Sequence, residues 1–158
     1  MTSGSDIAMA LRAAYLALHR RSDAAFAARG VTADQFVLLA TLARGHALTQ
    51  RELARRMSSD PSTVRAMLVL MERQGLVERD VHPTDARART VALTPKGKRA
   101  FRQLWAAGEP IRQQMIAVLD PDEADTLARL LTRVTAGLSP ESVPADSLDL
   151  SHPPEDNQ

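Results

Sequence analysis

Residues 48–68 constrain the fold more than any other part of this 158-residue chain, because they carry the start signals of two short helices separated by a tight turn. Thr49 is suited to cap the first helix, and Glu52, three residues later, is placed to close a capping box with it. Asp60 offers a second N-cap, and Pro61 follows at the first helical position, where a proline loses no hydrogen bond. The segment therefore predicts a helix-turn-helix whose second helix starts there.

Small and apolar residues inside this segment agree with that geometry. Ala54, Ser58, Val64 and Met67 have the spacing at which two steeply crossing helices need a small contact residue, a turn residue and two inward apolar side chains. Glycine is the usual turn residue of this motif, so Ser58 is a departure from the common pattern.

Two short β-prone runs follow the second helix. They occupy residues 76–80 and 89–93, and the residues between them include Pro83, Asp85 and Arg87. This pattern predicts a β-hairpin with an arginine near its tip, which beside a helix-turn-helix forms a wing.

Apolar residues at helical spacing organise the rest of the chain, so the predicted fold is mainly α with a small β-hairpin wing. We expect a first helix over residues 6–29 that ends at Gly30, and a last helix that extends to residue 137. N-cap residues mark the other helix starts, two of them with a capping-box partner: Thr32 with Gln35, Asp120 with Glu123, and Thr94 before a proline.

The net charge of +1 conceals an uneven distribution. Residues 138–158 contain five acidic residues, no lysine or arginine, four of the nine prolines and no sustained apolar period, which predicts a disordered acidic tail. Residues 48–99 contain 11 basic and six acidic residues. The excess positive charge thus lies on the predicted helix-turn-helix and wing together with the residues directly after them, as neutralisation of phosphates requires.

Taken together, these motifs resemble the MarR family of bacterial winged helix-turn-helix transcription regulators. The resemblance is carried by residues 60–64, 72–80 and 83–97, and its most specific part is Asp85-x-Arg87 followed by Leu93-Thr-x-x-Gly97. Many family members have a Ser/Thr-Arg pair and, one turn later, an Asp-Arg pair in the second helix. This chain has Arg65-Ala66 and Val69-Leu70 at those places.

The resemblance covers roughly residues 6–137 and implies a single domain, with a winged helix-turn-helix at about 31–94 and dimerisation helices at about 6–29 and 95–137. The terminal helices carry more apolar surface than a monomer needs to bury, which favours a homodimer over a monomeric helical bundle. A dimer would bind double-stranded DNA at a pseudo-palindromic operator with half-sites about 10 base pairs apart. The family implies repression more than activation.

The second helix of the motif is expected to enter the major groove, with Arg65 as the candidate for a guanine contact. Arg87 has the length and charge to enter the minor groove, and Asp85 would orient it or brace the hairpin. Each assignment has a structural alternative, which is ordinary helix-start chemistry for Ser62 and Thr63 and a solvated turn for the wing tip. The predicted DNA-binding residues are Gln50, Arg51, Ser62, Thr63, Arg65, Asp85, Arg87 and Arg89.

An effector pocket between the dimerisation and DNA-binding lobes is a second implication of the resemblance. Its predicted lining residues are Tyr15, His19, Phe36 and Trp105, and the expected ligand is a small aromatic or anionic molecule. The alternative for each of these residues is ordinary core packing, which is the common role of an aromatic residue on an amphipathic helix.

Several classes of protein are disfavoured by what the sequence lacks. The absence of cysteine excludes disulfides and thiolate metal sites. The sequence also lacks a helical His-x₃-His pair, so we expect neither a metal nor another cofactor. A hydrolase is not expected, because Gly-x-Ser-x-Gly and phosphate-loop motifs are missing. Without a signal pattern or a long apolar run, we expect a soluble cytoplasmic protein. The alternative function that stays open is a winged-helix interaction module without specific DNA binding. Such a module would not need the excess of basic over acidic residues in 48–99.

Overall fold

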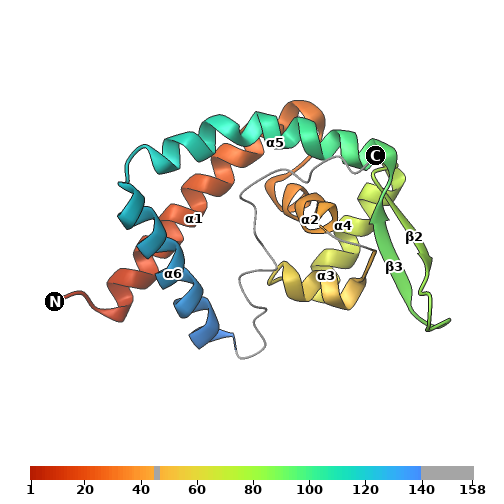
Figure 1. Cartoon of the computed structure of the whole chain (residues 1–158), viewed down its shortest axis with the longest axis horizontal. Helices are drawn as coiled ribbons and strands as arrows, with labels where there is room; N and C mark the ends of the chain where they lie inside the picture. The colour runs from red at the N-terminus through yellow and green to blue at the C-terminus, as the bar shows by residue number, and fades with distance from the viewer. Residues whose placement is uncertain (45–46, 140–158) are drawn as a thin grey trace.

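The computed structural model describes residues 1–44 and 47–139 of the chain. It has two parts (Figure 1), which we call the lobe (residues 23–44 and 47–111) and the arm (residues 4–22 and 112–138). The elements are α1 (Gly4–Phe26), the 3₁₀ helix η1 (Ala27–Arg29), α2 (Ala33–Ala43), β1 (Leu48–Thr49), α3 (Gln50–Arg56), α4 (Pro61–Arg73), β2 (Val77–Val81), β3 (Arg89–Leu93), α5 (Pro95–Ile116) and α6 (Pro121–Leu138).

The helix starts follow their capping residues. Thr32 with Gln35 and Asp120 with Glu123 form reciprocal capping boxes, which confirms both predictions. The Thr94 hydroxyl accepts the Gly97 amide at 3.0 Å, as expected of an N-cap.

The first helix differs from its prediction at both ends. It begins at Gly4 because Ser3 and Asp6 form a capping box that the apolar pattern did not reveal. Its α-helical part ends at Phe26, and residues 27–29 form a 3₁₀ turn before Gly30, whose φ of 65° reverses the chain. The predicted stop at Gly30 is confirmed, but a tighter last turn satisfies the backbone there.

The wing is an antiparallel hairpin in a three-stranded sheet of order β1-β3-β2. Val77 pairs with Leu93, and Val81 pairs with Arg89. The first strand therefore lies one residue later than predicted, and residues 48–49 add a strand that the sequence analysis did not anticipate. The mainly helical fold with a small sheet confirms the predicted fold class.

The lobe has a continuous core. Leu38 and Leu39 of α2 pack with residues of α3, α4, β3 and α5, and every one of the described residues classed as buried lies in the lobe. The fully buried members of this core include Leu53, Val64, Leu68, Met71, Val91 and Leu104.

A close backbone approach joins the wing to α5. A Cβ at Gly97 would lie 2.0 Å from the carbonyl oxygen of Leu76, which itself accepts the Thr94 amide at 3.1 Å. Only glycine fits at this crossing, which explains the glycine four residues after Leu93.

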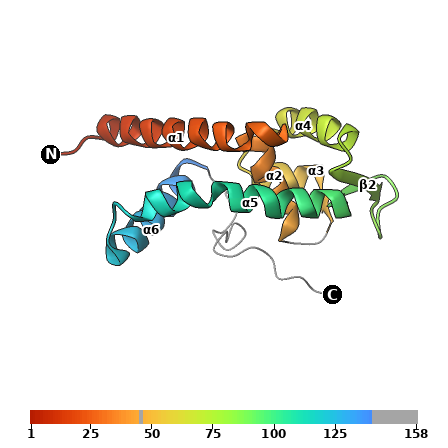
Figure 2. The ribbon, with the colours of Figure 1, turned by 90° about the horizontal axis from the view of Figure 1, so that it is seen from above.

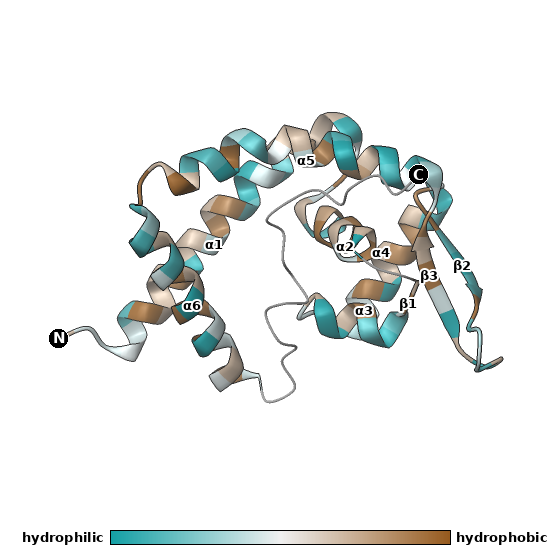
Figure 3. Cartoon of the chain, in the orientation of Figure 1, coloured by the Kyte–Doolittle hydropathy of each residue, from teal (hydrophilic) through white to brown (hydrophobic). Residues whose placement is uncertain are grey.

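The arm has no buried residue of its own. The last turns of α5 and the whole of α6 leave large apolar side chains exposed, and α1 and α5 run side by side while α6 turns away (Figure 2). Brown, hydrophobic segments recur along α1 and α6 (Figure 3). The exposed apolar residues of the arm include Ile7, Leu18, Met115, Ile116, Val118, Leu127, Leu130 and Leu131.

The last helix ends at Leu138, one residue beyond the predicted limit. The disordered tail was predicted for residues 138–158, and from residue 140 onward it lies outside the described residues. Among the described helices, none combines the length and apolar character that crossing a bilayer demands.

Candidate nucleic-acid interface

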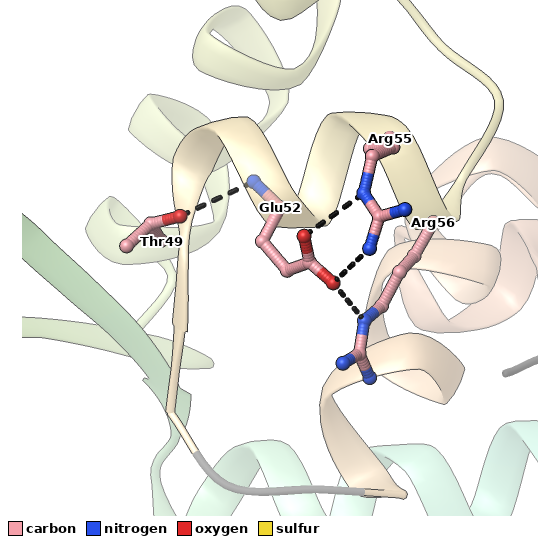
Figure 4. Close-up of polar contacts among 4 residues, drawn as sticks. All are labelled: Thr49, Glu52, Arg55 and Arg56. Atoms are coloured by element: carbon pink, nitrogen blue, oxygen red, sulfur yellow. Dashed lines mark hydrogen bonds and ion pairs between the residues drawn. The ribbon is translucent and has the colours of Figure 1, made fainter. Parts of the chain in front are cut away.

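The first helix of the motif, α3, starts at Thr49, whose hydroxyl accepts the Glu52 amide at 3.2 Å. The second half of the predicted capping box is absent. The Glu52 carboxylate turns instead toward Arg55, at 2.8 and 3.0 Å, and Arg56, at 2.8 Å (Figure 4). The capping-box prediction for Glu52 is therefore wrong, because charge-assisted bonds to two guanidinium groups are stronger than one bond to a neutral amide.

These bonds set the charge state of the end of α3. Hydrogen bonds from Arg55 and then Arg56 lower the pKa of Glu52 to about 2. The same contact with Glu52 raises the pKa of Arg55. The carboxylate thus holds both guanidinium groups in place and offsets part of the positive charge of α3.

The turn between the two helices passes through the left-handed region. Ser58 has a φ of 50°, and the amide of the next residue, Ser59, bonds to the carbonyl of Ala54 at 3.0 Å. The position is therefore one that favours glycine, as the sequence pattern indicated. Ala54, Val64 and Met67 are buried, so the predicted inward positions are confirmed.

The N-terminus of α4 is closed by Asp60. Its Oδ1 accepts the amides of Ser62 at 3.0 Å and Thr63 at 2.9 Å, and both hydroxyl groups donate to the same carboxylate. Hydrogen bonds from the Ser62 and Thr63 side chains hold the pKa of Asp60 well below its usual range. Ser62 and Thr63 therefore perform the helix-start role, with their hydroxyl groups still exposed and able to accept hydrogen bonds.

Gln50 and three of the four predicted arginines have different surroundings. The Gln50 amide donates to the carbonyl of Pro61 at 3.3 Å, which links the start of α3 to the start of α4. Arg51, Arg65 and Arg87 are exposed. Gln50 thus connects the two helices of the motif through this hydrogen bond, and the three arginines are accessible to a ligand.

The wing tip is shaped by Asp85. Its side chain accepts the Arg87 amide at 3.0 Å, and its carbonyl accepts the Ala88 amide at 3.0 Å. Asp85 therefore braces the hairpin backbone, which is one of the two roles predicted for it. Arg87 and Arg89 project from this braced segment and are exposed. The wing tip and α3 lie toward the same side of the lobe (Figure 1).

The four predicted effector residues fall into two groups. Phe36 and Trp105 each lie 5.9 Å from the ring of Phe101, measured between ring centroids. Tyr15 and His19 stack on each other at 5.4 Å, and His19 approaches Asp23 at 3.3 Å. No ring contact between the two groups is found in residues 1–44 and 47–139.

A cleft of about 390 Å³ exists elsewhere, on the side of α5 that meets the end of α4. Its lining includes Arg29, Leu76, Lys96 and Arg99, and none of the four predicted effector residues.

The sequence analysis also missed Arg112. This residue lies 4.0 Å above the Trp105 ring and bonds to Glu109 at 2.6 Å. The spacing of three residues between Glu109 and Arg112 is a helical pairing signal that could have identified the ion pair, and the same signal links Glu52 to Arg55.

Two helices across a left-handed turn, followed by a β-hairpin with an exposed arginine at its tip, define a winged helix-turn-helix protein. A model of the MarR family matches residues 31–88. The Multiple antibiotic resistance protein MarR of Salmonella typhimurium is 31% identical over 105 residues, which are 66% of this chain and 73% of that protein. The chain belongs to the MarR family.

Further relatives agree with this assignment. The HTH-type transcriptional repressor MdtR of Bacillus subtilis is 27% identical over 82% of this chain and 84% of its own length. The protein described as a transcriptional regulatory protein for the hcr operon of Thauera aromatica is 33% identical over 105 residues, which are 66% of this chain and 63% of that protein. The crystal structure of a MarR mutant from E. coli complexed with operator DNA superposes with a TM-score of 0.75 at 27% identity, covering 81% of this chain and 92% of that chain.

Proposed function

We propose that this protein is a sequence-specific DNA-binding transcription regulator that acts as a repressor. The observation that carries the proposal is the placement of α3, α4 and the wing tip, which presents Arg51, Arg65 and Arg87 as exposed cations on one motif. Membership of the MarR family, with a repressor and an operator complex among the similar proteins, supports the same function.

In the proposed complex, α4 lies in the major groove and Arg65 contacts a guanine. Arg87 enters the minor groove from the wing that Asp85 braces. Ser62, Thr63 and the remaining predicted residues contact the DNA backbone and fix the register. The remaining residues are Gln50, Arg51 and Arg89.

The proposed functional unit is a homodimer. The arm exposes Leu127 and Leu130 of α6 together with Ile7 of α1, and a second copy of the arm would remove these apolar side chains from water. Residues 6–137 would then form one domain, with 31–94 binding DNA and the two flanking segments forming the dimer. Two recognition helices related by two-fold symmetry would read half-sites about 10 base pairs apart.

A small aromatic or anionic effector is the proposed signal. Phe36 and Trp105 remain the better candidates for its pocket because they share one aromatic cluster, whereas Tyr15 and His19 would line a separate part. An effector releases DNA only if it binds the form with lower DNA affinity more tightly. We place the protein in the cytoplasm, with DNA, and propose that it acts by binding alone, without catalysis.

Selection of DNA fragments by the purified protein tests the proposed function. We expect enrichment of an inverted repeat and an affinity that falls steeply with salt. The absence of any enriched sequence would favour the alternative, an interaction module without specific DNA binding.

Quenching of Trp105, the single tryptophan, by small aromatic acids tests the effector proposal. Because coupling is reciprocal, operator DNA should weaken the binding of a true effector by the same factor as the effector weakens DNA binding. A ligand that binds equally with and without operator would not be the effector.

A further inference from the structure

The outward face of α4 has an apolar centre. Because successive residues turn by about 100° in an α-helix, Ser62, Ala66, Val69 and Arg73 fall within about 60° of one another on the helix surface. All four are exposed, and the Val69 side chain is 37% exposed.

This stripe is the part of α4 farthest from the protein core. The residues on the opposite face of the helix are buried, and they are Val64, Met67, Leu68 and Met71. A winged helix-turn-helix that binds DNA as proposed above places this outward stripe against the floor of the major groove.

The two flanks of the stripe are distinct. Glu72 pairs with Arg79 of β2 at 3.3 Å, so the Glu72 side of α4 faces the wing. Arg65 lies two turns before Glu72 and shares that side. Leu70 lies on the other flank and is 49% exposed.

The middle of the stripe offers no hydrogen-bonding group. Ala66 and Val69 present only methyl groups, between a hydroxyl at Ser62 and a guanidinium group at Arg73. In the major groove, thymine alone among the four bases presents a methyl group, and apolar side chains recognise it by contact. An apolar centre bordered by a hydroxyl and a guanidinium group, both of which bind phosphates, therefore matches a thymine-containing groove better than it matches an apolar protein surface.

We propose that Ala66 and Val69 determine operator specificity by contacting thymine C5-methyl groups in each half-site. The two residues lie about 4.5 Å apart along the helix axis, which is close to the separation of about 3.4 Å between successive bases of one strand. The pair therefore reads neighbouring thymines. This inference rests on the proposed function and adds the base that the centre of α4 recognises.

Deoxyuridine substitution tests the inference, because uracil differs from thymine only by the missing methyl group. The selected operator is synthesised with deoxyuridine in place of one thymine at a time, symmetrically in both half-sites. Each lost methyl contact should weaken binding by the wild-type protein about four-fold per half-site, the value of one buried methylene-sized group. Substitution at thymines outside the contact should leave the affinity unchanged.

Val69→Ala supplies the decisive comparison. This variant should bind the thymine operator more weakly and lose most of its discrimination against uracil at the same position. Leu70→Ala is the matched control, since it removes a more exposed aliphatic side chain from the flank of the same helix and should keep full discrimination. Ala66→Ser gives an independent second variant at the neighbouring contact.

The possible results separate this inference from the function on which it rests. A specific operator whose affinity is indifferent to uracil at every thymine would overturn the inference alone. Uracil discrimination that persists undiminished in Val69→Ala and Ala66→Ser would overturn it as well. A protein that selects no DNA sequence would overturn the proposed function together with the inference.

Discussion

The lobe and the arm contain similar kinds of apolar side chain but bury them to different extents. Leu68 in the lobe is fully buried, whereas Leu130 in the arm is 42% exposed. The lobe completes its core within one chain, and the arm lacks a partner for its apolar face. The difference supports the proposed dimer, in which a second copy of the arm would cover this apolar face.

The largest expected effect is on the arm. Leu130→Asp should convert the proposed dimer into a monomer, because burying one carboxylate from each protomer costs several kcal/mol per ion, enough to raise the dissociation constant by more than about a thousand-fold. Sedimentation velocity over a range of protein concentrations measures this change. Thr132→Asp, which adds the same charge to the opposite face of α6, should leave the dimer intact. An unaffected dimer in Leu130→Asp would remove α6 from the interface.

A core substitution in the lobe should have the next largest effect. Leu68→Ala leaves a cavity among fully buried residues and should lower the free energy of unfolding by about 2–5 kcal/mol. Urea unfolding followed by circular dichroism provides the measurement. The same truncation at the exposed Leu70 should change the free energy of unfolding by no more than about 0.5 kcal/mol. Equal losses at the two positions would contradict the burial difference that separates core from surface in α4.

The wing should contribute to affinity without contributing to folding. Arg87→Ala should lower operator affinity by about 1–3 kcal/mol and reduce the salt-dependence slope by about one per wing. Titration of labelled operator at several salt concentrations tests both numbers. Arg99→Ala removes another exposed arginine, one that lines the cleft beside α5, and it should change neither quantity. If the two variants behave alike, Arg87 acts only as a general surface charge.

The smallest expected effect concerns Glu52. Its pKa is lowered from 4.5 to about 2 in the folded protein, so the ionised form stabilises the fold. This contribution is complete above the ordinary pKa and is lost as the pH falls from about 4.5 toward about 2. Because the pair lies near the surface, we expect less than about 1 kcal/mol.

The measurement for Glu52 is the difference in melting temperature between the wild-type protein and Glu52→Gln as a function of pH. The difference should shrink as the pH falls below 4.5, the ordinary pKa of the group. Glu78→Gln, a change at an exposed residue of β2, serves as the control. A difference that grows on acidification would mean that the Glu52 carboxylate does not stabilise α3.

Local signals in the sequence predicted much of the lobe. The Asp60-Pro61 start of α4 and the capping box of Thr32 with Gln35 form as expected, because these interactions involve residues within three positions of each other. The turn at Ser58 was predicted from its place between two helix signals, and the structure adds its left-handed conformation, with a φ of 50°.

Predictions failed where several partners compete for one group. Glu52 fits a capping box by spacing, but two arginines in the next turn of the same helix bind its carboxylate instead. The effector residues Tyr15, His19, Phe36 and Trp105 remain a prediction from the family resemblance, which does not say which helix faces meet in this chain. Only the packing of α1, α2 and α5 divided these four residues into two groups.

The sequence by itself determined the order of helices, the helix-turn-helix and wing, and membership of the MarR family, because capping, turn and periodicity signals act over a few residues. The tertiary structure alone decided that Gly97 must pass against the Leu76 carbonyl and that the apolar face of the arm stays uncovered in one chain. Both outcomes depend on contacts between residues that are distant in sequence, and no local pattern encodes such contacts.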